Sequence, residues 1–177
     1  SMDILISSNL ERFLFAMTGN DGDKVAQWMK GLALDGCFTV DEETKNRMAQ
    51  FVVGGAADET ETLAMIQSCY AENQYLLDTH TAVALKVSRD YRNNSGNDRI
   101  AVIDSTAHPC KFVASVMNAL QQTQQSADEL EQLNQLVALT GITQHKGLLN
   151  LDKKPVLHQQ ICAKEQISAT VQQILGL

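Results

Sequence analysis

Apolar and polar residues recur along this chain mostly with the period of an α-helix. Apolar side chains stand three and four residues apart in long stretches, and polar or small residues separate these stretches. The pattern predicts about seven or eight helices. Their expected positions are close to residues 10–17, 21–32, 41–51, 58–70, 79–91, 113–120, 130–137 and 166–175.

Polar residues that suit helix starts precede several of these stretches. Asp41 and Asp78 or Thr79 stand where side-chain oxygens cap free backbone amides, and residues 58–61 supply an acidic first turn. Ser126 followed three residues later by Glu129 fits a capping box. These signals place helix starts at positions that the apolar periodicity also favours.

Only a few short stretches have the pattern of strands. Residues 3–6 and 36–40 are brief candidates, and the apolar run at 100–103 is expected to be a buried strand. A polar turn at 104–109 and then helical periodicity follow this run. Because so few strands cannot make a good sheet alone, we expect an α/β, helix-rich fold whose short strands complete a sheet supplied elsewhere.

Composition and charge narrow the class of protein. With 177 residues, 44% hydrophobic, the chain can bury one sizeable core, so we expect a single domain over 1–177. A net charge of −7 argues against a nucleic-acid or anionic-membrane surface. No apolar run is long enough for a membrane span, and no signal peptide is visible. Four scattered cysteines without a C-x-x-C pair favour a reducing cytoplasm and no zinc site.

Three polar segments are candidates for chemistry. Ser105 and Thr106 follow the expected strand, where α/β proteins bind ligands; His80 lies in the first turn of a helix; and Asn9 with Arg12 opens another helix. Each segment also has an ordinary explanation, because hydroxyl, amide and carboxylate side chains cap helices. From the residue types alone, capping is the favoured interpretation at all three places.

In this order, the three segments resemble threonine synthases of the larger form found in bacteria and fungi. Residues 2–12 (MDILISSNLER) are similar to that family's M-D-I-L-x-S-S-N-[FL]-E-R. Residues 77–83 (LDTHTAV) and 105–112 (STAHPCKF) are similar to its D-x-H-T-A-V and S-T-A-H-P-x-K-F segments. The likeness is strong from residue 2 to about 120 and weaker beyond.

The resemblance implies a fold-type-II, tryptophan synthase β-like enzyme that uses pyridoxal phosphate. Its members convert O-phospho-L-homoserine and water to L-threonine and phosphate. By resemblance, Thr106 meets the pyridine nitrogen of the cofactor, with Ser105 beside it, and a neutral hydroxyl there leaves that nitrogen unprotonated. The resemblance also implies candidates on the substrate side, of which two are cations suited to phosphate or carboxylate oxygens: Asn9, Arg12, His80 and Lys111.

One departure from the family matters as much as the matches. The family's Schiff-base lysine stands in an N-terminal phenylalanine-lysine-aspartate context, and none of the nine lysines here has that context. The loop that holds the cofactor phosphate is also absent. We therefore expect the C-terminal part of a threonine synthase, inactive alone, with no catalytic lysine, no covalently bound cofactor and no metal. An exposed sheet edge is expected to favour self-association.

Two other functions stay open from the sequence. The chain could be a non-catalytic binding or regulatory module that reuses this half of the fold. It could also belong to another fold-type-II enzyme, such as a serine/threonine dehydratase or a cysteine synthase. The S-S-N-L-E-R segment and the helix-rich composition argue against the second alternative.

Overall fold

The helices expected from the sequence form, and they account for the regular structure of the described chain. The computed structural model describes residues 7–120, 128–157 and 159–176. Its helices, in chain order, are α1 (Ser8–Met17), α2 (Gly22–Asp35), α3 (Glu42–Met48), α4 (Glu59–Asn73), α5 (Thr79–Ser95), η1 (Pro109–Phe112), α6 (Val113–Ala119), α7 (Glu129–Thr140), η2 (Leu151–Lys153), η3 (Lys164–Gln166) and α8 (Ile167–Leu175).

Carboxylate caps start most of the longer helices, as the sequence predicts. Asp41 accepts a hydrogen bond from the Thr44 amide at 2.9 Å and starts α3. Asp58 and Glu61 form a reciprocal capping box at the start of α4. At α7 the cap is Asp128; Ser126 of the expected capping box lies outside the described residues.

The strands expected from the sequence are not found. Residues 36–40 and 100–103 form no strand, and residues 3–6 lie outside the described part of the chain. The expectation that 100–103 is buried is wrong, since Ile100 is 95% exposed and Val102 is 86% exposed. A strand exists only through hydrogen bonds to a partner strand, and the described residues hold none. The sheet edge expected to favour self-association is therefore absent from them as well.

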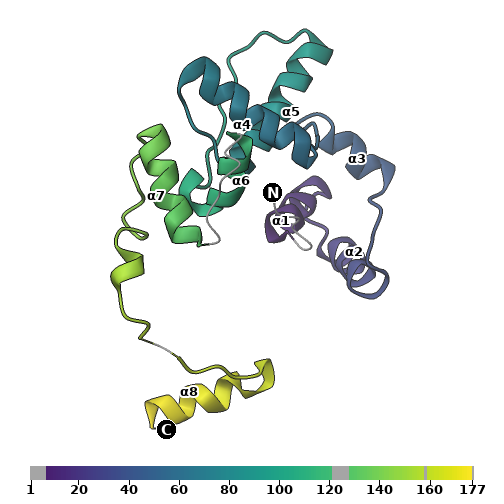
Figure 1. Ribbon diagram of the computed structural model, residues 1–177. Helices are drawn as coiled ribbons and strands as arrows, with labels where there is room; N and C mark the ends of the chain where they lie inside the picture. The colour runs from purple at the N-terminus through teal and green to yellow at the C-terminus, as the bar shows by residue number, and fades with distance from the viewer. Residues whose placement is uncertain (1–6, 121–127, 158, 177) are drawn as a thin grey trace. The chain divides into compact units, whose positions relative to one another are not determined.

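The chain divides into two compact units, residues 1–143 and 144–177. In the first unit, α4 packs against both α5 and α6, and α6 packs against α7, as Figure 1 shows. Their shared core includes the apolar residues Ile66, Ala82, Val116 and Leu136, and polar residues such as Thr62 and Asp78 are buried as well. In the same unit, α1 contacts α2 and α3, with Leu14 and Val25 buried.

Ion pairs join separate helices or their caps in the first unit. Lys86 on α5 lies 2.9 Å from Glu61 on α4 and 2.6 Å from Asp90. These carboxylates raise the pKa of Lys86, chiefly through Asp90, and Lys86 lowers the pKa of Glu61. Lys24 on α2 lies 3.0 Å from Asp41. The pKa of Asp41 is lowered to about 2. The hydrogen bond from the Thr44 amide is the largest cause, and the hydrogen bond from Lys24 is the next.

The second unit has little buried surface of its own. It holds η2, η3 and α8, and none of its described residues is buried. Apolar side chains on α8 are exposed, among them Val171 and Ile174. No described helix in either unit is long and apolar enough to cross a membrane.

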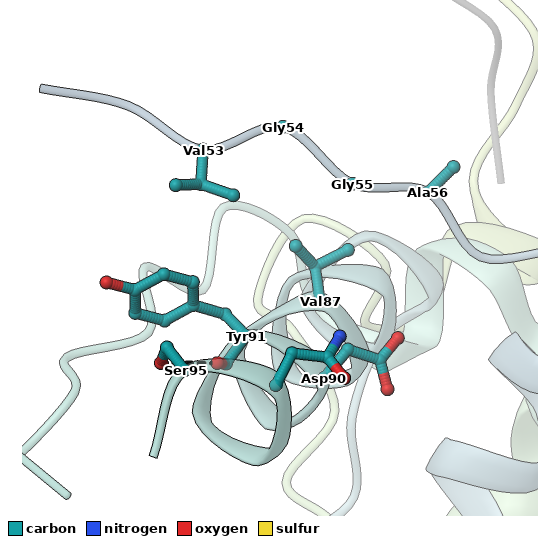
Figure 2. A pocket seen from close by; sticks show the side chains of 9 residues that line it. Val53, Gly54, Gly55, Ala56, Val87, Asp90, Tyr91 and Ser95 are labelled. Atoms are coloured by element: carbon teal, nitrogen blue, oxygen red, sulfur yellow. Dashed lines mark hydrogen bonds between the residues drawn. The ribbon is translucent and has the colours of Figure 1, made fainter. Parts of the chain in front are cut away.

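A strap formed by residues 49–56 joins α3 to α4 and lies along one side of α5. Figure 2 shows the backbone of Gly54 and Gly55 passing over α5, with Val87 pointing toward Gly55 and Tyr91 beside Val53. A Cβ at Gly55 would lie 2.6 Å from Val87 Cγ1, which is closer than carbon atoms can pack. Glycine at this position therefore sets how near the strap approaches the helix.

Candidate functional site

The polar turn at 104–108 leads into a tight helical turn. Pro109 opens η1, where its missing amide hydrogen costs nothing, and His108 Nδ1 accepts a hydrogen bond from the Cys110 amide at 3.2 Å. Pro109 and Cys110 are buried, whereas Ser105 and Thr106 are exposed. Neither hydroxyl residue caps the helix, because His108 does so. The capping explanation favoured by residue type therefore does not apply to Ser105 and Thr106.

The start of α5 is built around one buried carboxylate. Asp78 is only 1% exposed. Its Oδ1 accepts hydrogen bonds from the amides of His80 at 2.9 Å and Thr81 at 3.2 Å, and its Oδ2 accepts one from the Thr81 hydroxyl. The expected helix start at 78 or 79 is confirmed, with Asp78 as the cap. The positive end of the helix dipole further favours a carboxylate at this position.

Two contacts bring these segments together, although 24 residues separate them. The hydroxyl oxygens of Thr81 and Ser105 lie 3.1 Å apart. The ring of His80 meets the ring of Phe112 edge to face, with centroids 5.0 Å apart at 78°. The first turn of α5 thus touches both ends of the 105–112 segment.

Lys111 lies beside this junction. Its Nζ stands 5.4 Å from the centroid of the Phe112 ring, and its side chain is exposed. A cation at this distance from an aromatic face is held weakly. The structure therefore brings together three of the predicted site residues: Ser105, His80 and Lys111.

Asn9 and Arg12 form a separate pair on α1. The Arg12 guanidinium donates a hydrogen bond to Asn9 Oδ1, and both residues are exposed. This bond uses one of the five N–H groups of the guanidinium. Within residues 7–120, no recorded hydrogen bond or ring contact joins this pair to α5 or to the 105–112 segment. The expected gathering of Asn9, His80 and Thr106 in one cleft stays a prediction.

The predicted residues border different hollows on the described surface. Ser105 and His108 line a cavity of about 430 Å³ together with Tyr70, Tyr75, Thr140 and Thr143. His80 lines a groove of about 810 Å³ between the strap and α5. The groove continues past Val87 to the hollow drawn in Figure 2. Arg12 borders a third hollow of about 400 Å³ with Phe15 and Val25.

The side chains that line the cavity beside Ser105 indicate what kind of molecule it could bind. Among the described residues, the cavity beside Ser105 is lined by hydroxyl, phenol and imidazole groups and by no Lys, Arg, Asp or Glu. Such a lining can hold a neutral or zwitterionic molecule through directed hydrogen bonds. In the part of the chain that is described, no group of three His, Cys, Asp or Glu residues could hold a metal ion.

Sequence reasoning missed two residues of the junction. Phe112 stands in the sequence only as part of a motif, and nothing local indicates that its ring meets His80. Thr81 stands three residues after Asp78, which is the spacing at which a cap side chain reaches the helix, so its bond to Asp78 could have been found. Its contact with Ser105 depends on helix packing and leaves no local signal.

Comparisons with known proteins agree with the motif resemblance. Residues 81–141 match a family model described as Threonine synthase, C-terminal. The chain is 36% identical over 121 residues to "Threonine synthase-like 1" of Homo sapiens. This match covers 68% of this chain and 16% of the human protein. The chain thus spans about a sixth of the length of the curated relatives that it matches first.

Two solved structures share the fold. The structure of pyridoxal-phosphate-bound threonine synthase from Brucella melitensis matches with 36% identity and a TM-score of 0.59, over 76% of this chain and 28% of that chain. The structure of yeast threonine synthase matches with 25% identity and a TM-score of 0.76, over 99% of this chain and 35% of that chain. The helix-rich architecture is therefore similar to the portion of the threonine synthases that it matches.

Proposed function

Because this chain is a relative of the threonine synthases, matched through their C-terminal region, we propose that it forms one wall of a threonine synthase active site. The complete enzyme would convert O-phospho-L-homoserine and water to L-threonine and phosphate. The observation that carries the proposal is the junction of the D-T-H-T and S-T-A-H-P-C-K-F segments, joined by Thr81–Ser105 and His80–Phe112. Residues 81–141, which match the family model, include most of this junction.

The residues of the turn fit pyridoxal phosphate. The cofactor supplies an electron sink for carbanions of the substrate when it is bound. A neutral hydroxyl at Thr106 can form one hydrogen bond to the pyridine nitrogen and leaves that nitrogen unprotonated. Thr106 is exposed and therefore accessible to a ligand. Support for the cofactor comes from the similar Brucella melitensis structure, which is that of a pyridoxal-phosphate-bound threonine synthase.

The proposed substrate contacts come from side chains that attract oxyanions. Lys111 and Arg12 are exposed cations suited to the phosphate or carboxylate of O-phospho-L-homoserine. His80 can donate a hydrogen bond from its ring, and Asn9 can donate from its amide. The guanidinium of Arg12 is already oriented by Asn9 Oδ1, which lowers the entropy cost of binding an anion.

The rest of the active site must then come from polypeptide outside this chain. None of the nine lysines has the sequence context of the family's cofactor lysine. Without that nucleophile the chain alone should be inactive, since the covalent step has no amine in the correct place. We propose that residues 1–177 are the C-terminal part of a cytoplasmic enzyme. The similarities favour this function over a dehydratase or a binding module.

Variants of Thr106 in the complete protein test the proposal. We expect Thr106→Ala to weaken cofactor retention about tenfold or less, because one neutral hydrogen bond is lost. The loss in turnover should be larger, since ring electronics act in the carbanion steps. Thr106→Ser should keep most of the activity, and Thr106→Asp should fail because a carboxylate favours a protonated ring.

The measurements are phosphate release, threonine formation and bound cofactor for each variant. The reading frame of the gene should also encode the missing lysine segment upstream. An Ala variant with the turnover of the wild type would show that Thr106 does not contact the cofactor. A wild-type complete protein that releases no phosphate from O-phospho-L-homoserine would overturn the function itself.

A further inference from the structure

Three side chains link the start of α5 to the exposed turn at 104–108. Asp78 and Thr81 are 1% and 4% exposed, and Thr81 connects the buried carboxylate to Ser105. Ser105 in turn lies 3.5 Å from the carbonyl oxygen of Ala107, across the position of Thr106. A path of hydrogen-bonding groups therefore runs from the helix cap to Ser105, the residue that precedes Thr106.

The number of hydrogens on these groups fixes what each can do. Thr81 has a single hydroxyl hydrogen, and the Asp78 carboxylate is the strongest acceptor within reach. With that hydrogen directed to Asp78, the Thr81 oxygen can accept the single hydroxyl hydrogen of Ser105, which then does not donate to the Ala107 carbonyl. The hydroxyl of Ser105 is thereby occupied by the protein, whereas Thr106 keeps its hydroxyl for a ligand. The two neighbouring hydroxyl residues thus have different roles.

A second contact holds the other end of the segment. The edge-to-face pair of His80 and Phe112 fixes the residues after the turn against the same first turn of α5. Since Asp78 also accepts the His80 amide, one carboxylate orders both anchors. The turn that carries Thr106 is therefore held at two places by a single helix start.

We propose that Thr81 is a positioning residue, which holds Ser105 through its buried hydroxyl and so aims the hydroxyl of Thr106. The inference rests on the proposed function only for the identity of the ligand that Thr106 meets. Ser105 is then part of the support and not a direct contact of the cofactor ring. Asp78 sets the direction of the hydrogen bonds and does not itself reach the ligand.

Removing the Thr81 hydroxyl without changing its shape tests the positioning directly. Thr81→Val keeps a β-branched side chain of the same size, and Thr81→Ser restores the hydroxyl. Thr62→Val is the matched control, because Thr62 on α4 is 2% exposed and donates its hydroxyl to the Asp58 carbonyl at 2.7 Å. Each variant is made in the chain of residues 1–177, with the threonine methyl groups labelled for NMR.

The readout is the order parameter and chemical shift of the Thr106 methyl group. We expect Thr81→Val to lower the order parameter and move the shift, while Thr81→Ser and Thr62→Val leave both near the wild-type values. No change at Thr106 in Thr81→Val would overturn the proposal. An equal change in Thr62→Val would also overturn it, because a general loss of stability would then explain the effect.

The same variants in the complete protein connect positioning with the reaction. Thr81→Val should lower kcat about two- to tenfold with a smaller change in KM, and Thr81→Ser should recover most of that loss. Unchanged kcat in Thr81→Val despite a disordered Thr106 would contradict the positioning role. A wild-type complete protein without threonine synthase activity would overturn the proposed function alone, since the NMR result does not depend on it.

Discussion

Replacing Asp78 with alanine should destabilise the first unit more than any other cap replacement at α4 or α5. The carboxylate accepts hydrogen bonds from two amides and from the Thr81 hydroxyl while only 1% exposed. Loss of a helix cap costs about 0.5–2 kcal/mol. Donors left without an acceptor in a buried place add about 1–3 kcal/mol, and the two costs partly overlap. We expect Asp78→Ala to lower the free energy of unfolding by about 2–4 kcal/mol.

Two further variants separate capping from burial and from charge. Asp58 caps α4 with the same chemistry but is exposed, so Asp58→Ala should cost only about 1 kcal/mol. Asp78→Asn keeps an oxygen for the two amides, since asparagine caps as well as aspartate, and should cost less than Asp78→Ala. Its amide would donate to Thr81, which reverses the direction of the Thr81–Ser105 bond.

The assay is urea unfolding of the chain followed by far-UV circular dichroism, with equal denaturant slopes as the check on the unfolded state. We expect Asp78→Ala to be the most destabilising of the three variants, with Asp58→Ala and Asp78→Asn each costing less. If Asp78→Ala costs no more than Asp58→Ala, the buried carboxylate does not hold the start of α5 in the way described. The Thr81–Ser105 link would then lose its anchor.

Three other outcomes are expected. Gly55→Ala should destabilise the chain by about 1–3 kcal/mol because its Cβ would meet Val87, whereas Gly54→Ala, with open space around its Cβ, should melt like the wild type. The folded pKa of Asp41 is about 2 against 3.8, so its stabilising effect is present above pH 3.8 and lost as the pH falls toward 2. Asp41→Asn should therefore show a smaller acid-induced drop in melting temperature than the wild type. Incubated with pyridoxal phosphate, the chain alone should give no borohydride-stable label on a lysine, and one labelled lysine in peptide mass spectrometry would refute this.

Local signals in the sequence were sufficient for most of the helices and for the caps Asp41 and Asp78. Asp41, Asp58 and Asp78 precede periodic apolar stretches, and each caps a helix in the structure. Such caps depend on residues only two or three positions apart, so a single sequence can reveal them. The same holds for α8, whose periodic residues predict a helix whether or not its apolar face is covered.

The sequence was insufficient where a structure depends on a distant partner. The apolar run at 100–103 has the composition of a buried strand, yet a strand needs a second strand, and Ile100 and Val102 are exposed. The Thr81–Ser105 and His80–Phe112 contacts follow from the packing of separate segments. Motif resemblance indicates that these segments matter, but which atoms meet depends on how the folded chain packs.

The most direct test of the central claim is a chimeric enzyme. In it, this chain replaces the aligned region of yeast threonine synthase, a region that matches over 99% of the chain. The measurement is phosphate release that depends on O-phospho-L-homoserine, with threonine as the second product. If the chain forms the cofactor-facing wall, the chimera should release phosphate and make threonine, and Thr106→Ala in it should lose most of that activity. A folded chimera that binds pyridoxal phosphate but makes no threonine would contradict the claim.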